Sequence, residues 1–524
     1  MNAKLYRLVF SRSRGTLVAA AENVASSGKS AAGESSGGRI AVAGLALVAG
    51  SAFGQALPGN ATIQQGAASI GVNGAAMVVK QTTPRLVADW QSFSIGAGNS
   101  VQFVQPSSAS VALNRVTGNE ASAIFGSLTA NGHVYLQNPA GVLFAPGSQV
   151  NVGALVATTL QADLTAFRAG ELRLSGGEAS RGEVVNRGTI TTPAGGHVVL
   201  AGPQVGNTGS ISTPLGTTAL AAGNAVNVDP TGSGLLSISI PVAALGAHLS
   251  NTGSINADGG LVALQAAATD AALRSVMQVG GVVRARSIEQ RDGQIVLSGG
   301  ASGVVAVTGT LDASGAAGSD ARGGSVQVLG ERVALLGNAR IDASGDLGGG
   351  SVNVGGNFQG KGPLQNALDT YVGGGTVIDA SARRSGDGGN VVVWSDHTTT
   401  FKGKVDATGG SERGDGGNAE VSGKQSLRFG GDANLRAPRG KMGTLLLDPS
   451  TITVGLVADV NGDNTTGDDM PATLNGSGYY SIFSSDYPGA NSRITGAQVA
   501  NMLFNAQVTL QATADINITA HPPR

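Results

Sequence analysis

The chain has 524 residues, a net charge of −1, 83 glycines and no cysteine. The lack of cysteine excludes disulfides, thiol catalysis and cysteine-ligated zinc. The charge balance, with no basic arm beyond the N-terminal segment, argues against a nucleic-acid partner. Hydrophobic residues make up 41% of the chain and charged residues only 13%, a composition typical of many short strands joined by tight glycine turns.

The N-terminal segment has the pattern of an export signal. An apolar run at 40–53 follows a basic stretch, and small residues stand at the −3 and −1 positions of a cleavage site after Ala56. The run is too short for a transmembrane helix, which needs about 20 apolar residues. The sequence therefore predicts an extended signal peptide over 1–56, removed by cleavage after Ala56.

The next region, from Gly71 onward, alternates apolar and polar residues in short runs. Examples are 77–81, 85–90, 133–138 and 197–202, each bounded by Gly, Asn or Pro. Such runs indicate short β-strands, and no window keeps a helical period over a long stretch. We therefore predict an all-β fold.

Two stretches of this region resemble the haemagglutination-activity segment of the two-partner secretion domain, known from the filamentous haemagglutinin family. They read ADWQSFSIGAGNSVQFVQPSSASVALNRVTG at 88–118 and IFGSLTANGHVYLQNPAGVLFAPGSQVNVGALVATT at 124–159. The resemblance implies a right-handed, single-stranded parallel β-helix (a solenoid), with a secretion domain over 57–300. It also implies a partner outer-membrane barrel transporter with periplasmic recognition domains. The first residues resemble the extended signal peptide region of the same class, through Asn2, Lys4, Tyr6, Arg7, Val9, Phe10, Arg14 and Val18.

One turn in this segment departs from the family pattern. Where the family has Asn-Pro-Asn-Gly, this chain has Asn138-Pro139-Ala140-Gly141. Asn138 can cap the turn, Pro139 fixes φ and Gly141 can take a positive φ. A structural turn and a transporter-recognition site are both compatible with these residues. The same two interpretations apply to a further set of residues. For these, the structural interpretation is that they belong to ladders of side chains stacked inward: Asn114, Arg115, Asn151, Gly153, Thr158 and Thr159.

The remainder, 301–524, is repetitive. An Asp-Ala-Ser/Thr unit recurs at Asp312, Asp342, Asp379 and Asp406, with spacings of 30, 37 and 27 residues. Repeats of this length predict a solenoid. With about 20–25 residues in each rung, we expect about 20 rungs and a rod on the order of 100 Å long. The last strands look as if they lie within a rod, and nothing after them resembles a cap, an anchor or a toxin domain, so we expect a truncated form.

Two short motifs have a functional and a plain interpretation. Arg413-Gly414-Asp415 is a cell-attachment tripeptide, but the GDGGN sequence at 414–418 repeats the one at 386–390, which favours a turn repeat. Asp459, Asn461 and Asp463 could bind calcium, although the glycine and glutamate of a calcium loop are absent, which favours a solvated loop. The five histidines show no metal-ligand spacing, and no catalytic motif or cofactor site is evident.

These observations predict a secreted or surface-associated protein that is not an enzyme. We expect an adhesin-type exoprotein, exported through its partner transporter, that binds host or bacterial surfaces, a receptor or a glycan, through its rod. The alternative is a secreted ligand-capture protein that binds haem or a haem carrier. Long loops added to the helix would favour capture, and the sequence shows only modest insertions.

Overall fold

The computed structural model describes part of the chain, which divides into two units, Met1–Ala52 and Phe53–Arg524. The described residues are 6–11, 16–21, 57–455, 493–495, 502–512 and 515–518, with gaps at 178–179, 181, 231–234, 270–274 and 289–290. In the first unit, β1 (Tyr6–Ser11) pairs antiparallel with β2 (Thr16–Ala21). The expected cleavage residue Ala56 and the calcium candidates Asp459, Asn461 and Asp463 lie outside the described residues.

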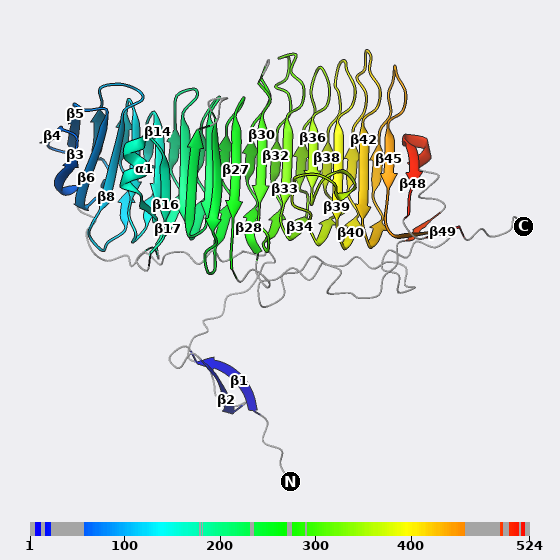
Figure 1. The fold of residues 1–524 in the computed structure, drawn as a ribbon, viewed down its shortest axis with the longest axis horizontal. Helices are drawn as coiled ribbons and strands as arrows, with labels where there is room; N and C mark the ends of the chain where they lie inside the picture. The colour runs from blue at the N-terminus through cyan, green and yellow to red at the C-terminus, as the bar shows by residue number, and fades with distance from the viewer. Residues whose placement is uncertain are drawn as a thin grey trace, which may run out of the picture. The chain divides into compact units, whose positions relative to one another are not determined.

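The second unit is a right-handed parallel β-helix built from three long sheets, as the sequence predicts (Figure 1). The first sheet contains β3 (Gly59–Gln65), β6 (Arg85–Ser92), β8 (Val111–Val116), β11 (His133–Gln137), β14 (Ala154–Thr158), β19 (His197–Gly202), β22 (Thr217–Ala222), β27 (Leu261–Ala266), β30 (Gln294–Ser298), β33 (Ser325–Leu329), β36 (Ser351–Val354), β39 (Asn390–Ser395), β42 (Asn418–Gly423), β45 (Thr444–Leu447) and β48 (Gln507–Leu510).

The other two sheets have shorter strands. The second sheet contains β4 (Ala68–Asn73), β5 (Ala76–Gln81), β7 (Ser100–Val104), β10 (Ser127–Ala130), β13 (Gln149–Asn151), β18 (Thr189–Thr191), β21 (Ser210–Ser212), β26 (Ser254–Asn256), β29 (Val282–Arg284), β32 (Thr310–Asp312), β35 (Arg340–Asp342), β38 (Val377–Asp379), β41 (Lys404–Asp406) and β44 (Asp432–Asn434). The third contains β9 (Ser122–Ile124), β12 (Val142–Phe144), β17 (Glu183–Asn186), β20 (Gln204–Asn207), β25 (His248–Asn251), β28 (Ser275–Val279), β31 (Val304–Val307), β34 (Arg332–Leu335), β37 (Asp369–Val372), β40 (Thr398–Phe401), β43 (Ser426–Phe429), β47 (Arg493–Thr495), β46 (Thr451–Gly455) and β49 (Asp515–Ile518).

A typical rung passes through the third, the second and then the first sheet, as β17, β18 and β19 do. The described residues supply 14 or 15 strands to each sheet. At ~4.8 Å for each strand, this stack is about 65 Å long. The expectation of about 20 rungs is therefore too high for this part of the chain, because the corners are longer than the repeat estimate assumed.

The interior is filled by columns of aliphatic side chains. Parallel pairing places the central residue of each second-sheet strand directly above its counterpart, as in Ile341 and Ile378. Each residue of this column is fully buried: Ile190, Ile211, Ile255, Val283, Leu311, Ile341, Ile378 and Val405. Phe401 and Phe429 also stack, with ring centroids 5.4 Å apart. The burial of these columns supplies the main favourable free energy of folding.

A column of glycines stands at the corner where the chain enters the first sheet. A Cβ on Gly350 would overlap the carbonyl oxygen of Gly324, and a Cβ on Gly389 would overlap that of Gly350. The column follows the order of the first-sheet strands: Gly132, Gly153, Gly196, Gly216, Gly260, Gly293, Gly324, Gly350, Gly389, Gly417 and Gly443. The same relation joins each member to the one before it except at Gly293, where an added Cβ would overlap the carbonyl oxygen of Ala285 instead. Glycine is required here because the preceding rung occupies the space of a side chain.

The interior also holds an asparagine ladder that the sequence analysis did not identify. Asn186 Nδ2 donates to Asn207 Oδ1 at 2.8 Å, and Asn207 Nδ2 donates to Asn251 Oδ1 at 2.7 Å. All three side chains are fully buried. The two hydrogen bonds pair polar groups that would otherwise be costly inside the core, whereas Asn251 Nδ2, at the end of the ladder, has no partner among the described residues.

The Asp-Ala-Ser repeats form a second ladder, at the ends of second-sheet strands. Asp312, Asp342, Asp379 and Asp406 lie in register on successive rungs. Ser344 Oγ donates to Asp342 Oδ1 at 2.7 Å, and Arg340 pairs with the same carboxylate at 2.9 Å. Cation pairing and hydroxyl donors thus offset the repulsion between stacked carboxylates.

Two insertions cover the outer face of the first sheet. One forms a side sheet of antiparallel strands, β15 (Gln161–Ala162), β16 (Leu172–Ser175), β23 (Ala225–Pro230) and β24 (Leu236–Val242), with the helix α1 (Leu164–Ala169). Its Leu174 and Val226 pack on outward side chains such as Val199. The second contains the 3-10 turn η2 (Phe358–Gly360). The insertions are thus larger than the sequence suggested.

Asp163 begins α1, since its carboxylate accepts hydrogen bonds from the backbone N–H groups of Thr165 and Ala166 at 2.7 and 3.2 Å. Gly170, at φ 97°, ends the helix. Among the residues described, no helix has the length and hydropathy needed to cross a membrane.

Substitution Gly350→Ala tests the glycine column. The added Cβ has no space between the rungs, so we expect a loss of about 2–3 kcal/mol in stability, seen as a lower apparent melting temperature. Gly374→Ala is the matched control, because a Cβ there would meet only the carbonyl oxygen of Lys402 at 3.8 Å. Equal melting temperatures for the two variants would contradict the role assigned to the column.

Candidate functional site

The Asn138 turn joins β11 to β12, and its asparagine is buried. Asn138 Oδ1 accepts a hydrogen bond from Ala140 N at 3.0 Å, which is the expected capping contact. Its Nδ2 donates to Glu120 O at 2.9 Å and to Ser122 Oγ at 3.0 Å, both on the preceding rung. The amide therefore closes the turn and also fixes it to its neighbour.

Gly141 completes this turn with φ 125°, and its N–H donates to Asn138 O at 3.0 Å. The positive φ is the conformation expected from the sequence. Gly182 N, on the following rung, donates to Pro139 O at 3.1 Å. Because Asn138 and Gly141 are buried, Pro139 and Ala140 are the residues of the turn that a partner could touch.

Asn114 and Arg115 connect the rungs beneath this turn. Trp90 Nε1 donates to the buried Asn114 Oδ1 at 3.0 Å, and Asn114 Nδ2 donates to Tyr135 O at 3.3 Å. Arg115 forms a bidentate ion pair with Asp89, with Nε–Oδ1 at 2.7 Å and NH2–Oδ2 at 2.8 Å. Both residues thus cross-link successive strands of the first sheet.

The other residues that the sequence analysis grouped with Asn114 and Arg115 lie in different environments. Asn151 points outward and is exposed, where it is hydrogen-bonded by the Thr191 hydroxyl, so an inward ladder is wrong for this residue. Gly153 belongs to the glycine column. Thr158 and Thr159 are buried, and Thr158 Oγ1 accepts from Leu160 N at 2.9 Å.

Two histidines whose contact the sequence analysis did not predict lie together beside Tyr135, which contacts Phe167 of α1. The rings of His133 and His197 are 5.2 Å apart, and Tyr135 lies 6.5 Å from His197 and 6.3 Å from Phe167. Burial, and then the neighbouring His133, lower the pKa of His197 to about 3. Burial raises the pKa of Tyr135 to about 12. Their shared Gly-His-Val context was the available signal, since it places both histidines at the start of first-sheet strands.

The tripeptide Arg413–Asp415 lies at the corner between β41 and β42. Gly386 N donates to Arg413 O at 2.9 Å, Asp415 N donates to Asp387 Oδ1 at 2.8 Å, and Lys441 N donates to Asp415 Oδ1 at 2.8 Å. Arg413 and Asp415 are exposed, but the tripeptide is bonded to the rung on each side. The repeated GDGGN sequences therefore stack, and attachment through this tripeptide stays a prediction.

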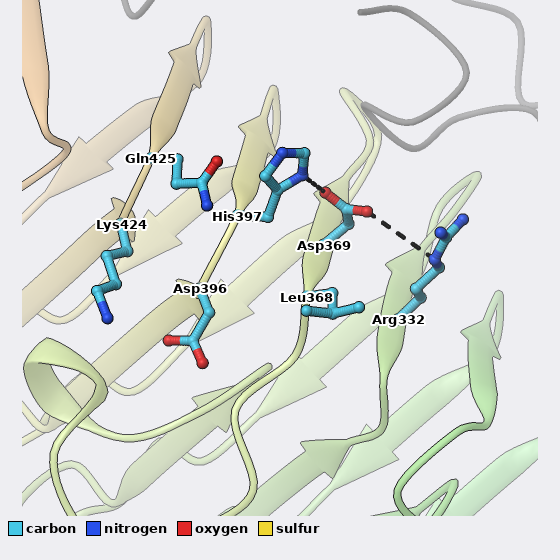
Figure 2. A pocket seen from close by; sticks show the side chains of 7 residues that line it. All are labelled: Arg332, Leu368, Asp369, Asp396, His397, Lys424 and Gln425. Atoms are coloured by element: carbon cyan, nitrogen blue, oxygen red, sulfur yellow. Dashed lines mark hydrogen bonds and ion pairs between the residues drawn. The ribbon is translucent and has the colours of Figure 1, made fainter.

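A pocket of ≈ 470 Å³ opens on the third sheet and is lined by Arg332, Leu368, Asp369, Asp396, His397, Lys424 and Gln425 (Figure 2). Asp369 lies between a histidine and an arginine: its Oδ1 is 3.0 Å from His397 Nδ1, and its Oδ2 is 3.9 Å from Arg332 Nε. The residues drawn include no serine, threonine or cysteine that an aspartate–histidine pair could activate as a nucleophile. One hydrogen bond and one ion pair of Asp369 thus join three rungs.

Metal ligation has no candidate within the described part of the chain, where no group of three or more His, Asp or Glu side chains could hold an ion. The contacts above mostly join one rung to the next. Their common effect is to fix strand register, which is the role of ladders in a solenoid.

Comparisons with known proteins agree with this geometry. The family model described as the TPS secretion domain matches residues 54–315, and the model described as the Extended Signal Peptide of Type V secretion system matches residues 1–52. Among solved structures, the HMW1 secretion domain from Haemophilus influenzae has a TM-score of 0.64 and 28% identity. That likeness covers 74% of this chain and 100% of the solved one.

Two curated relatives are both named heme/hemopexin-binding protein, from Haemophilus influenzae. They are 48% identical over 103 residues and 51% identical over 83 residues, which is 20% and 16% of this chain. The chain spans only 11% and 9% of the length of these relatives.

Substitution Asn138→Asp tests the buried turn. It replaces a donating NH2 group by an acceptor that faces Glu120 O, so we expect a loss of about 2–4 kcal/mol in stability, measured as a lower apparent melting temperature. Asn151→Asp is the control, because Asn151 is exposed and should tolerate a carboxylate. A variant at position 138 that melts like the control would contradict the structural role of the amide.

The His133–His197 pair predicts acid sensitivity. The unfolded chain protonates a histidine near pH 6.5, whereas His197 in the fold takes a proton only near pH 3. Between these values the unfolded state binds the extra proton, so stability falls as the pH falls. Between pH 7 and pH 5 we expect His197 to contribute a loss of about 1–2 kcal/mol.

Thermal melts of the native chain and of His197→Phe at both pH values measure this contribution. The variant should lose less stability on acidification than the native chain. The same pH dependence in both proteins would contradict the assignment.

Proposed function

Because the chain belongs to the two-partner secretion family of exoproteins, we propose that it is an adhesin-type member, which attaches to host or bacterial surfaces through the outside of its β-helix. Family membership makes it a secreted protein that crosses the outer membrane through a partner transporter. The receptor, whether a protein or a glycan, belongs to the proposal.

The filled interior is the observation that favours attachment. Aliphatic columns occupy the space between the three sheets, so ligands have access only to the outer faces and corners. Those faces repeat along the stack of rungs, and a repeated surface can make several weak contacts at once. We propose a binding role without catalysis, since the polar groups in register on successive rungs serve mainly to join those rungs.

The sheets continue without interruption across residue 300, from β30 to β33 in the first sheet. We still propose that residues 57–300 form the secretion domain and that residues 301–524 form the rod. Within the first part, we propose that the half-buried Pro139–Ala140 edge contributes to transporter recognition, while buried Asn138 supports its shape.

The alternative is capture of haem or a haem carrier. It is supported by the names of the two heme/hemopexin-binding relatives and by the side sheet, which adds a larger insertion than the sequence suggested. The support is limited, because the matched segments are about a tenth of those relatives.

Attachment is tested in a non-adherent Gram-negative host that carries the partner transporter, with and without this chain. We expect the chain to raise the number of bacteria bound to epithelial monolayers, or to other bacteria, severalfold over the transporter alone. Hemin titration of the secreted chain, followed by the Soret band, runs in parallel. Unchanged attachment together with stoichiometric hemin binding would overturn the adhesin proposal in favour of capture.

A further inference from the structure

A groove of ≈ 620 Å³ lies on the outer face of the first sheet, across β39, β42, β45 and β48. The insertion that contains η2 forms its rim, with Phe358 and Gln359 among the lining residues. The groove is separate from the Asn138 turn, the tripeptide corner and the pocket of Figure 2.

The rim is held firmly in place. Trp394 projects from β39 and is buried beneath the insertion, where a Cβ on Gly360 would lie 2.6 Å from its ring. Trp394 Nε1 donates to Asp396 Oδ1 at 3.1 Å, and Asn366 Nδ2 donates to Gly360 O at 2.9 Å. The groove is therefore a preformed feature of the fold, which reduces the entropic cost of binding.

Two rows of side chains give the groove its chemistry. Asn390, Asn418 and Thr444 lie in register on three strands and present amides and a hydroxyl. The neighbouring row, Val392, Glu420 and Leu446, presents two aliphatic groups and a carboxylate. At the rim the Phe358 side chain is 54% exposed.

Glu420 is the unusual member of the lining. Its side chain is 1% exposed, its Oε2 accepts from Gln359 N at 2.7 Å, and its Oε1 has no hydrogen-bond partner among the described residues. Burial raises its pKa to about 7, although the hydrogen bonds from Gln359 N and from the Ser422 side chain act in the opposite direction. The charge of Asp448 raises this pKa further, and that of Lys361 lowers it. A buried carboxylate oxygen without a donor leaves a place for a donor from a ligand.

We propose that this groove binds a neutral saccharide, with a sugar hydroxyl donating to Glu420 Oε1. The proposal rests on surface attachment as the function and names the ligand class at one site. Amide side chains both donate and accept, which suits the hydroxyl groups of a sugar. The apolar face of a sugar ring can cover Phe358, Val392 and Leu446. Acidic sugars would be repelled by Glu420 and Asp448.

The test uses the secreted chain and a defined set of sugars: maltotriose, cellotriose, chitotriose, lactose and sialyllactose. Saturation-transfer difference NMR and calorimetric titration measure binding. We expect at least one neutral sugar to bind, with affinity reduced tenfold or more by Glu420→Gln and by Phe358→Ala. The control variants are Glu412→Gln and Leu245→Ala, which change an exposed carboxylate and an exposed apolar side chain outside the groove.

A pH titration gives a second readout. A hydroxyl that donates to Glu420 favours its ionised form, so binding should release a proton and be tighter at pH 8 than at pH 5.5. Glu420→Gln should remove the part of this difference that comes from Glu420, and any pH dependence left in the variant would come from Asp448 or Lys361. Binding with the same pH dependence in native chain and variant would overturn the role of Glu420.

The proposal is overturned if none of the neutral sugars binds, if sialyllactose binds more tightly than they do, or if both groove variants bind like the controls. Failure of the groove and failure of the adhesin proposal are distinguishable. Bacteria that carry Phe358→Ala and still attach would leave the adhesin proposal in place without this groove. A secreted chain that binds sugar but does not promote attachment would leave the groove without the adhesin role.

Discussion

The rung-to-rung spacing of the parallel sheets is the constraint on which the rest of this structure depends. Strands stack ~4.8 Å apart, and where the chain enters the first sheet, the backbone of one rung fills the space of a side chain on the next. The glycine column from Gly132 to Gly443 meets this demand. With the corner fixed, side chains at equivalent positions fall directly above one another. The aliphatic columns, the Asn186–Asn207–Asn251 ladder and the aspartate ladder all follow from that superposition.

Because equivalent positions lie above one another, the side chains inside the molecule are similar from rung to rung, whereas those on the outer faces can differ. Each core position must match its neighbours above and below, so the interior accepts aliphatic groups or hydrogen-bonded ladders. The two large insertions both cover the first sheet. The side sheet with α1 buries Tyr135 and His197, and the insertion around Phe358 encloses Glu420. The groups with strongly raised or lowered pKa values are therefore found where an insertion removes an outward side chain from water.

The sequence was sufficient for the repetitive features. Alternating short runs predicted an all-β fold, and the family resemblance implied the β-helix. The Asp-Ala-Ser repeats predicted a solenoid, and Asn138-Pro139-Ala140-Gly141 predicted a capped turn with a positive φ at Gly141. The sequence was not sufficient to predict contacts between residues whose separation along the chain varies from rung to rung. Asn186, Asn207 and Asn251 are unevenly spaced along the chain, and the outward side of Asn151 depends on the register of β13. The meeting of His133 with His197 and the burial of Glu420 depend on insertions whose docking no local pattern reveals.

The insertion around Phe358 shows how such a scaffold can change. It lies within the longest interval between successive aspartates of the ladder, yet Asp342 and Asp379 remain paired in register. The extra residues are absorbed outside the stack, and the columns inside are unaffected. A β-helix of this kind can therefore exchange one surface loop for another without redesign of its core. The surface can therefore change the ligand that it recognises while the residues that the fold requires stay the same.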